Sequence, residues 1–151
     1  MSTKARQELI TKLSFTDNTQ RSDLLDANMT NTWLIQMLDT LVEDLIGEPI
    51  TILAARTDHP TPDGAWAHSG GLAVDLYPKN WQGREQESVV NVFKAIAKNP
   101  YAWVIGFGGV TQQWQSYVTW PTENFVAFND NNSDHIHLGA AMNGGGPGKA
   151  R

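Results

Sequence analysis

The chain has 151 residues, a length typical of one domain, and its 11 basic and 16 acidic residues give a net charge of −5 with neutral histidines. This charge argues against sequence-independent binding to nucleic acid or to anionic membranes. The chain contains no cysteine, which excludes thiolate zinc fingers, iron–sulfur clusters and cysteine nucleophiles.

Helical periodicity dominates the first third of the chain. The spacing of apolar residues predicts a short helix over residues 4–13, and a polar, turn-rich segment follows over residues 15–28. Asn31 or Thr30 can cap a second helix, which Gly47 ends. The apolar stripe predicted for this second helix consists of Leu34, Leu38, Leu41, Val42 and Leu45.

Short β-branched and apolar runs predict strands in the remainder of the chain. Residues 57–70 hold several prolines and glycines and predict a long irregular loop, which is often a functional feature. An amphipathic helix is predicted over residues 84–98. The predicted strands cover residues 50–55, 72–77, 101–107, 115–120, 125–128 and 135–138. This order of elements predicts an α+β domain with a largely antiparallel sheet.

The composition also predicts the domain limits. We expect a single domain over residues 1–142 and a flexible glycine-rich tail over residues 143–151. Residues 1–12 lack the apolar stretch of a secretory signal peptide, and no apolar run is long enough to span a bilayer. We therefore expect synthesis in the cytoplasm and no association with membranes.

Two segments hold candidate metal ligands. The first reads His-Ser-Gly-Gly-Leu-Ala-Val-Asp and runs from His68 to Asp75, and the second reads Asp-His-Ile-His and runs from Asp134 to His137. Two imidazoles and one carboxylate supply N, O and N ligands that suit Zn²⁺, and three protein ligands leave the fourth position open, as in catalytic sites. Gly70 and Gly71 let the backbone turn between His68 and the following strand.

The pattern His-x-x-Gly-x-Ala-x-Asp, followed far downstream by an acid-x-x-His, resembles the M15 family of zinc peptidases. This family includes D-alanyl-D-alanine carboxypeptidases and phage L-alanyl-D-glutamate endopeptidases, and it shares its fold with the hedgehog signalling domain. The resemblance covers Arg56 to His137, about half of the chain. It implies a small antiparallel sheet with helices on one face and a zinc site on the other.

The resemblance also implies a role for each matching residue. His68, Asp75 and His137 match the zinc ligands, and Asp134 matches the general base. Arg56, at the end of a predicted strand, matches an arginine that holds the carbonyl oxygen of the substrate as it gains negative charge.

The chain departs from the family pattern near these residues. Trp66 stands where the family usually has serine, and the base is Asp rather than the Glu of the dipeptidases, as in the phage endopeptidases. His135 forms a His-x-His pair with His137, and both side chains are expected on one face of a strand. Two roles for His135 stay open: a catalytic one, as a second proton carrier or a donor to the transition state, and an orienting one. His59 is interpreted as a solvated loop residue.

The expected function is zinc-dependent hydrolysis of a peptide bond in bacterial cell-wall peptide. The residues indicate only a zinc hydrolase, and the resemblance supplies the peptidoglycan substrate. The absence of a signal peptide fits a phage lysin that is carried in a virion or released to the periplasm during lysis, and it fits a cytoplasmic dipeptidase equally. The alternative is a non-enzymatic virion or interaction protein that retains the zinc site and binds an assembly partner.

Overall fold

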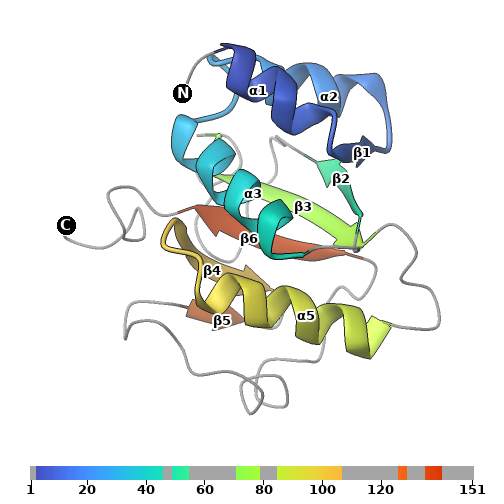
Figure 1. Cartoon of the computed structure of the whole chain (residues 1–151), viewed down its shortest axis with the longest axis vertical. Helices are drawn as coiled ribbons and strands as arrows, with labels where there is room; N and C mark the ends of the chain where they lie inside the picture. Colours follow the sequence, from blue (N-terminus) through green and yellow to red (C-terminus); the bar gives the residue numbers. More distant parts are fainter. Residues whose placement is uncertain are drawn as a thin grey trace.

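The computed structural model describes residues 3–45, 49–54, 71–78, 85–106, 126–128 and 135–140, and these residues form an α+β fold (Figure 1). The helices are α1 (Thr3–Ile10), α2 (Asn18–Leu25), α3 (Thr32–Asp44) and α5 (Glu85–Ala97). The strands are β1 (Leu13–Phe15), β2 (Ile50–Ala54), β3 (Ala73–Pro78), β4 (Ala102–Gly106), β5 (Val126–Phe128) and β6 (Ile136–Ala140).

The strands form one six-stranded sheet in the order β1-β2-β3-β6-β4-β5. The central pairs β2–β3, β3–β6 and β6–β4 are antiparallel, but the outer pairs β1–β2 and β4–β5 are parallel. The sheet is therefore mixed: three of its five strand pairs are antiparallel, as expected, and the two parallel edge pairs correct the expectation of an antiparallel sheet. Parallel neighbouring strands need a long crossover connection. Between β1 and β2 this connection contains the helices α2 and α3.

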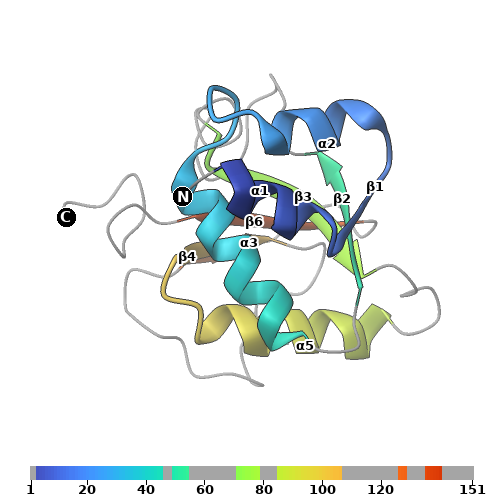
Figure 2. The ribbon, with the colours of Figure 1, turned by 45° about the horizontal axis from the view of Figure 1, so that its top comes forward.

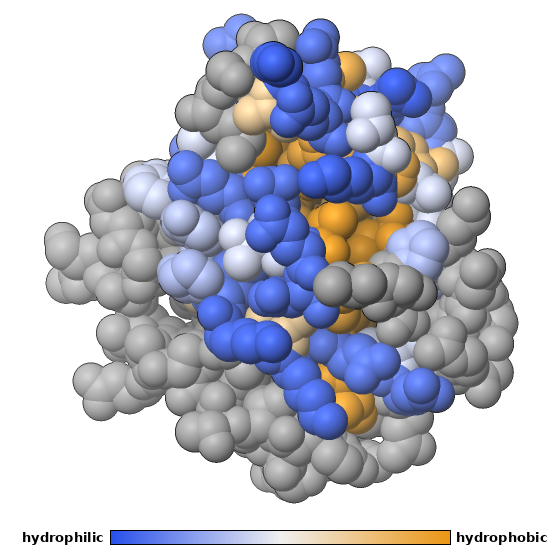
Figure 3. All heavy atoms as spheres, viewed as in Figure 1, coloured by the Kyte–Doolittle hydropathy of each residue, from blue (hydrophilic) through white to orange (hydrophobic). Residues whose placement is uncertain are grey.

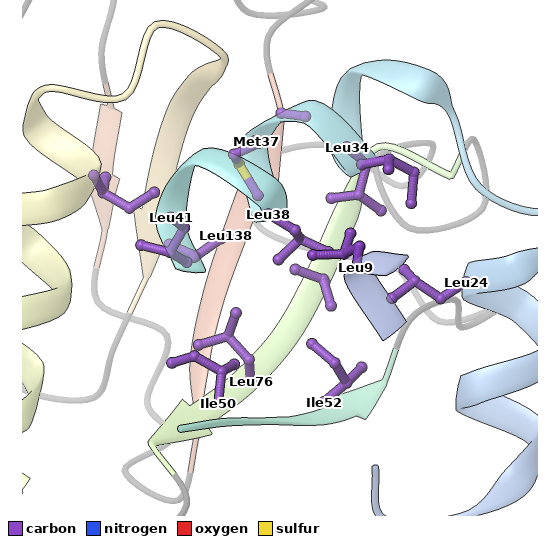
Figure 4. Packing of buried hydrophobic residues seen from close by; sticks show 14 of the residues in the cluster. Leu9, Leu24, Leu34, Met37, Leu38, Leu41, Ile50, Ile52, Leu76 and Leu138 are labelled. Atoms are coloured by element: carbon purple, nitrogen blue, oxygen red, sulfur yellow. The ribbon is translucent and has the colours of Figure 1, made fainter. Parts of the chain in front are cut away.

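The helices pack on one face of this sheet. Figures 1 and 2 show α3 lying across β3 and β6, with α5 beside it over β4. Val74 and Leu76 of β3 and Leu138 of β6 join the helices in a single apolar core. Figure 4 shows side chains of α1, α2 and α3 converging on those of β2, β3 and β6. Because successive residues of a strand alternate between faces, the intervening residues Asp75 and His137 belong to the opposite face.

The two predicted amphipathic helices are confirmed as α3 and α5. Asn31, rather than Thr30, caps α3, and its side chain accepts a hydrogen bond of 2.9 Å from the backbone N–H of Trp33. The predicted stripe of α3 is largely buried, and Ile35 and Met37 are buried as well. This wider apolar face fits a helix that packs both on the sheet and on its helical neighbours α1 and α5.

The prediction for the segment before α3 is wrong in two places. Helix α1 ends at Ile10, and Leu13 begins the edge strand β1 instead of the last helical turn. Residues 15–28, expected to be turns, contain α2, whose N-terminus is capped by Asp17 through a bond of 3.1 Å from the Gln20 N–H. The sequence of α2 has almost no apolar periodicity, and only Leu24 of this helix is fully buried. The apolar pattern therefore did not predict the helix.

The strands predicted at residues 50–55, 72–77, 101–107, 125–128 and 135–138 correspond to β2, β3, β4, β5 and β6. The predicted loop at 57–70, the predicted strand at 115–120 and the predicted tail at 143–151 lie outside the described residues.

The described helices present mainly hydrophilic residues on their outer surfaces, with apolar residues visible between them (Figure 3). Within the described ranges, every helix is too short or too polar to cross a membrane.

Candidate metal centre

The two central strands of the sheet bring Asp75 and His137 together. Asp75 lies directly opposite His137 in the antiparallel register of β3 and β6, although 62 residues separate them in sequence. Both residues alternate with core residues, so their side chains stand on the face of the sheet away from the helices. The structure therefore pairs two of the three predicted zinc ligands across the two central strands of the sheet.

The side chains are in direct contact. Nδ1 of His137 lies 3.2 Å from Oδ1 of Asp75, within hydrogen-bond distance. Nε2 of His135, which immediately precedes β6, lies 3.6 Å from Oδ2 of the same carboxylate. The contact of His135 is longer than a hydrogen bond, but it is close enough for electrostatic attraction. One carboxylate is thus flanked by two imidazoles, one at each oxygen.

All three side chains are shielded from solvent. The exposed fractions are 5% for Asp75, 8% for His135 and 2% for His137. Burying a carboxylate costs several kcal/mol unless positive charge or hydrogen-bond donors offset the lost hydration. The His137 ring can donate its Nδ1–H to Asp75 in the matching tautomer, and a bound cation would supply positive charge directly. The arrangement can therefore either form a hydrogen bond between imidazole and carboxylate or hold a cation.

The distance between the two donor atoms suits either a hydrogen bond or two ligands of one ion. Two ligand atoms about 2.0–2.1 Å from a tetrahedral Zn²⁺ lie about 3.3 Å from each other. The distance of 3.2 Å between His137 Nδ1 and Asp75 Oδ1 matches this value. Among the described residues, no set of three or more His, Asp or Glu side chains could by itself hold a metal ion.

Three other predicted site residues, His68, Arg56 and Asp134, lie outside the described residues, as do Trp66 and His59. Their assigned roles remain predictions. The described part of the predicted site is the Asp75–His137 pair with His135 beside it.

Two glycines lie near the pair in the sheet. Gly71 has a φ of +72°, a conformation that side chains disfavour, which confirms a backbone turn just before β3. Gly106 of β4 lies opposite His137 on the other side of β6 from Asp75. A glycine within a strand often marks the close approach of a ligand or of another backbone. Only the strand register could have identified Gly106, because its position in the sequence gives no such signal.

No family model matches the chain, and no curated protein or solved structure matches it either.

Proposed function

We propose that the protein is a zinc-dependent peptidase that hydrolyses a peptide bond in bacterial cell-wall peptide. The observation that carries the proposal is the buried contact of 3.2 Å between His137 and Asp75. The residue pattern predicts these two side chains as ligands of one ion, and their opposed positions in β3 and β6 and the distance of 3.2 Å between them support a shared ion. The cell-wall substrate rests on the resemblance of the sequence pattern to M15 peptidases.

Asp75, His137 and His68 would hold the ion in this proposal. Bound zinc would act as a Lewis acid toward the substrate carbonyl and would make water more acidic. The carboxylate of Asp75 reduces the net positive charge of the site, and its second oxygen faces His135. Burial of the pair excludes bulk water and strengthens the electrostatic interactions of these ligands. Asp134 would accept a proton and deliver it to the leaving amine, and Arg56 would stabilise negative charge on the carbonyl oxygen.

Metal analysis tests the ligand assignment. We expect the wild-type protein to bind one zinc ion and to cleave purified muropeptides, whereas Asp75→Asn and His137→Ala bind little zinc and show no cleavage. Asp44→Asn is the matched control, because it removes one carboxylate from an exposed position at the end of α3. Equal metal content and equal cleavage in wild type and His137→Ala would refute the assignment.

Asp134→Ala separates the enzyme from its non-enzymatic alternative. In an enzyme this substitution abolishes hydrolysis and leaves zinc content and stability unchanged. A wild-type protein that binds zinc at His68, Asp75 and His137 but cleaves no muropeptide would instead support a binding or assembly protein that retains the site.

A further inference from the structure

A buried arginine lies in the N-terminal helix, away from the candidate metal centre. Arg6 of α1 is only 3% exposed. Its Nη1 donates hydrogen bonds of 2.9 Å to the carbonyl of Leu24 and 2.8 Å to the hydroxyl of Thr30. Its Nη2 donates a bond of 2.8 Å to the carbonyl of Thr30. A single guanidinium therefore ties α1 to the end of α2 and to the loop that precedes α3.

Gly71 packs against the loop that Arg6 holds, which consists of residues 29–31. The backbone N–H of Asn31 donates a hydrogen bond of 2.8 Å to the carbonyl of Gly71. A Cβ atom added to Gly71 would lie 2.5 Å from the carbonyl oxygen of Met29 and 2.8 Å from Cα of Thr30. We call residues 29–31 the Gly71 seat. Contacts this close leave no room for a side chain at Gly71. A shift of residues 29–31 would therefore shift Gly71 as well.

Gly71 in turn leads directly into the strand that carries Asp75. Leu72 accepts a hydrogen bond of 2.7 Å from the N–H of Ala140 in β6, and β3 begins at the next residue. The start of β3 is thus held on one side by the Gly71 seat and on the other by β6. Any shift of the seat would act on β3 and therefore on the alignment of Asp75 with His137.

A charged group is a costly means of joining two helices and a loop. The three oxygens that Arg6 contacts are neutral, and burial lowers the pKa of its guanidinium while the nearby carboxylate of Asp26 opposes this effect. Apolar residues of similar volume often stabilise a core as well as buried charges do, whereas the fixed fork of a guanidinium sets the positions of several acceptors at once. The network therefore favours a positional role over a contribution to stability alone.

We propose that Arg6 is a positioning residue for the candidate metal centre, acting through Thr30 and the Gly71 seat on the strand that carries Asp75. The inference rests on the proposed zinc function for its consequence, but its structural part can be measured on metal-free protein. It assigns a role in ligand alignment to the N-terminal helices, which contribute no ligand.

The experiment compares Arg6→Met with Asn99→Ala in the full chain. Asn99 is also buried, and its side chain donates a hydrogen bond of 2.9 Å to the carbonyl of Met37, so it anchors the middle of α3 and not the residues of the Gly71 seat. Zinc affinity is measured by chelator competition, and the amide hydrogen exchange of residues 72–76 is measured in metal-free protein. The absorption spectrum of bound Co²⁺ reports the geometry of the ligands.

We expect Arg6→Met to weaken zinc binding by about tenfold or less, because Arg6 acts on ligand alignment through Thr30 and β3 and does not contact a proposed ligand, to speed exchange in β3 and to change the Co²⁺ spectrum. Arg6→Lys should recover part of the affinity, because it retains the charge and one set of donors. Asn99→Ala should lower the melting temperature and leave the zinc affinity and the spectrum unchanged. Equal effects of the two variants on zinc and on β3 exchange, or none from either, would overturn the proposal.

Gly71→Ala provides a second route if Arg6→Met does not fold. It changes the other side of the same contact and leaves α1 intact, so it should weaken zinc binding and speed β3 exchange as well. Wild-type zinc affinity in a folded Gly71→Ala protein would contradict the proposal. If the wild-type protein takes up no zinc, the proposed function fails, whereas faster β3 exchange in Arg6→Met but not in Asn99→Ala still supports the role of Arg6 in holding β3.

Discussion

At the scale of single residues, the central feature is a carboxylate with an imidazole at each oxygen. His137 contacts Oδ1 of Asp75 and His135 lies near Oδ2. Partners of this kind fix the orientation of a ligating carboxylate, and their loss usually weakens metal binding by about 10- to 100-fold. If Asp75 binds zinc as proposed, the closeness of His135 to its second oxygen supports the orienting role for His135 among the two that the sequence left open.

We expect His135→Ala to weaken zinc binding about tenfold and His135→Gln to recover most of that affinity, because the amide nitrogen of glutamine can take the place of Nε2. Isothermal titration with zinc measures both variants. A His135→Ala protein that binds zinc as the wild type does, yet has lost muropeptide cleavage, would assign His135 to catalysis instead.

The pairing at the site could be predicted from the sequence because its spacing is unusual. The offsets of Gly71 and Asp75 from His68, with His137 far downstream, selected two residues that the structure brings into contact. Arg6 was missed, although it carried a signal. It lies three and four residues before Leu9 and Ile10, so a charge falls on the apolar face of the predicted helix. The sequence marks its partner Thr30 only as a possible helix cap, because the acceptors of a buried arginine are set by tertiary structure.

At the scale of elements, α3 is the helix on which the core depends. It has five fully buried side chains and contacts α1, α5 and β6. Figure 4 shows Leu38 and Leu41 near Leu138, on the side of β6 that faces the helices. Helix α3 therefore packs directly on β6, the strand that carries His137.

We expect Leu38→Ala to lower the free energy of unfolding by about 2–5 kcal/mol, because Leu38 is fully buried and its loss leaves a cavity between α3 and the sheet. Urea denaturation measures the change. Glu43→Ala, at an exposed position of the same helix, should change stability by less than about 0.5 kcal/mol. Similar small losses in the two variants would show that α3 does not pack on the sheet as described.

Elements with a strong apolar pattern were predictable, and those fixed by tertiary contacts were not. Helices α3 and α5 and strands β2 to β6 have clear periodic or β-branched sequences. Helix α2 buries only Leu24 fully and depends on its Asp17 cap, so a local pattern could not reveal it. Strand β1 has three residues, and its parallel pairing with β2 depends on where α2 and α3 carry the chain. Strand direction at the sheet edges is thus set by the connections and not by the strands themselves.

At the scale of the whole molecule, an ion that binds only the folded protein must stabilise it. With free zinc at 100 times its dissociation constant, the linkage contributes about 2.7 kcal/mol. For a chain of this size, that corresponds to a rise of roughly 5–11 °C in the melting temperature. We expect this rise in calorimetry of the wild-type protein and its reversal by a chelator.

Asp75→Asn provides the control for this measurement, because it retains the shape of the side chain and removes the charge that a cation requires. Its melting temperature should not depend on zinc. A wild-type protein whose melting temperature is the same with zinc and with chelator would show that the native fold does not bind the ion.

The sheet order also has a consequence for how the chain folds. Strand β6, the last described strand in the sequence, lies between β3 and β4 at the centre of the sheet. Before β6 pairs with them, β3 and β4 each have one unpaired edge. During synthesis on the ribosome, both edges would stay unpaired until the segment that contains β6 has been made. Contacts between residues so far apart in sequence form slowly because they close a long loop. His137 thus meets Asp75 in the same late step that closes the sheet, so the candidate site would be absent from every partly folded form that precedes it.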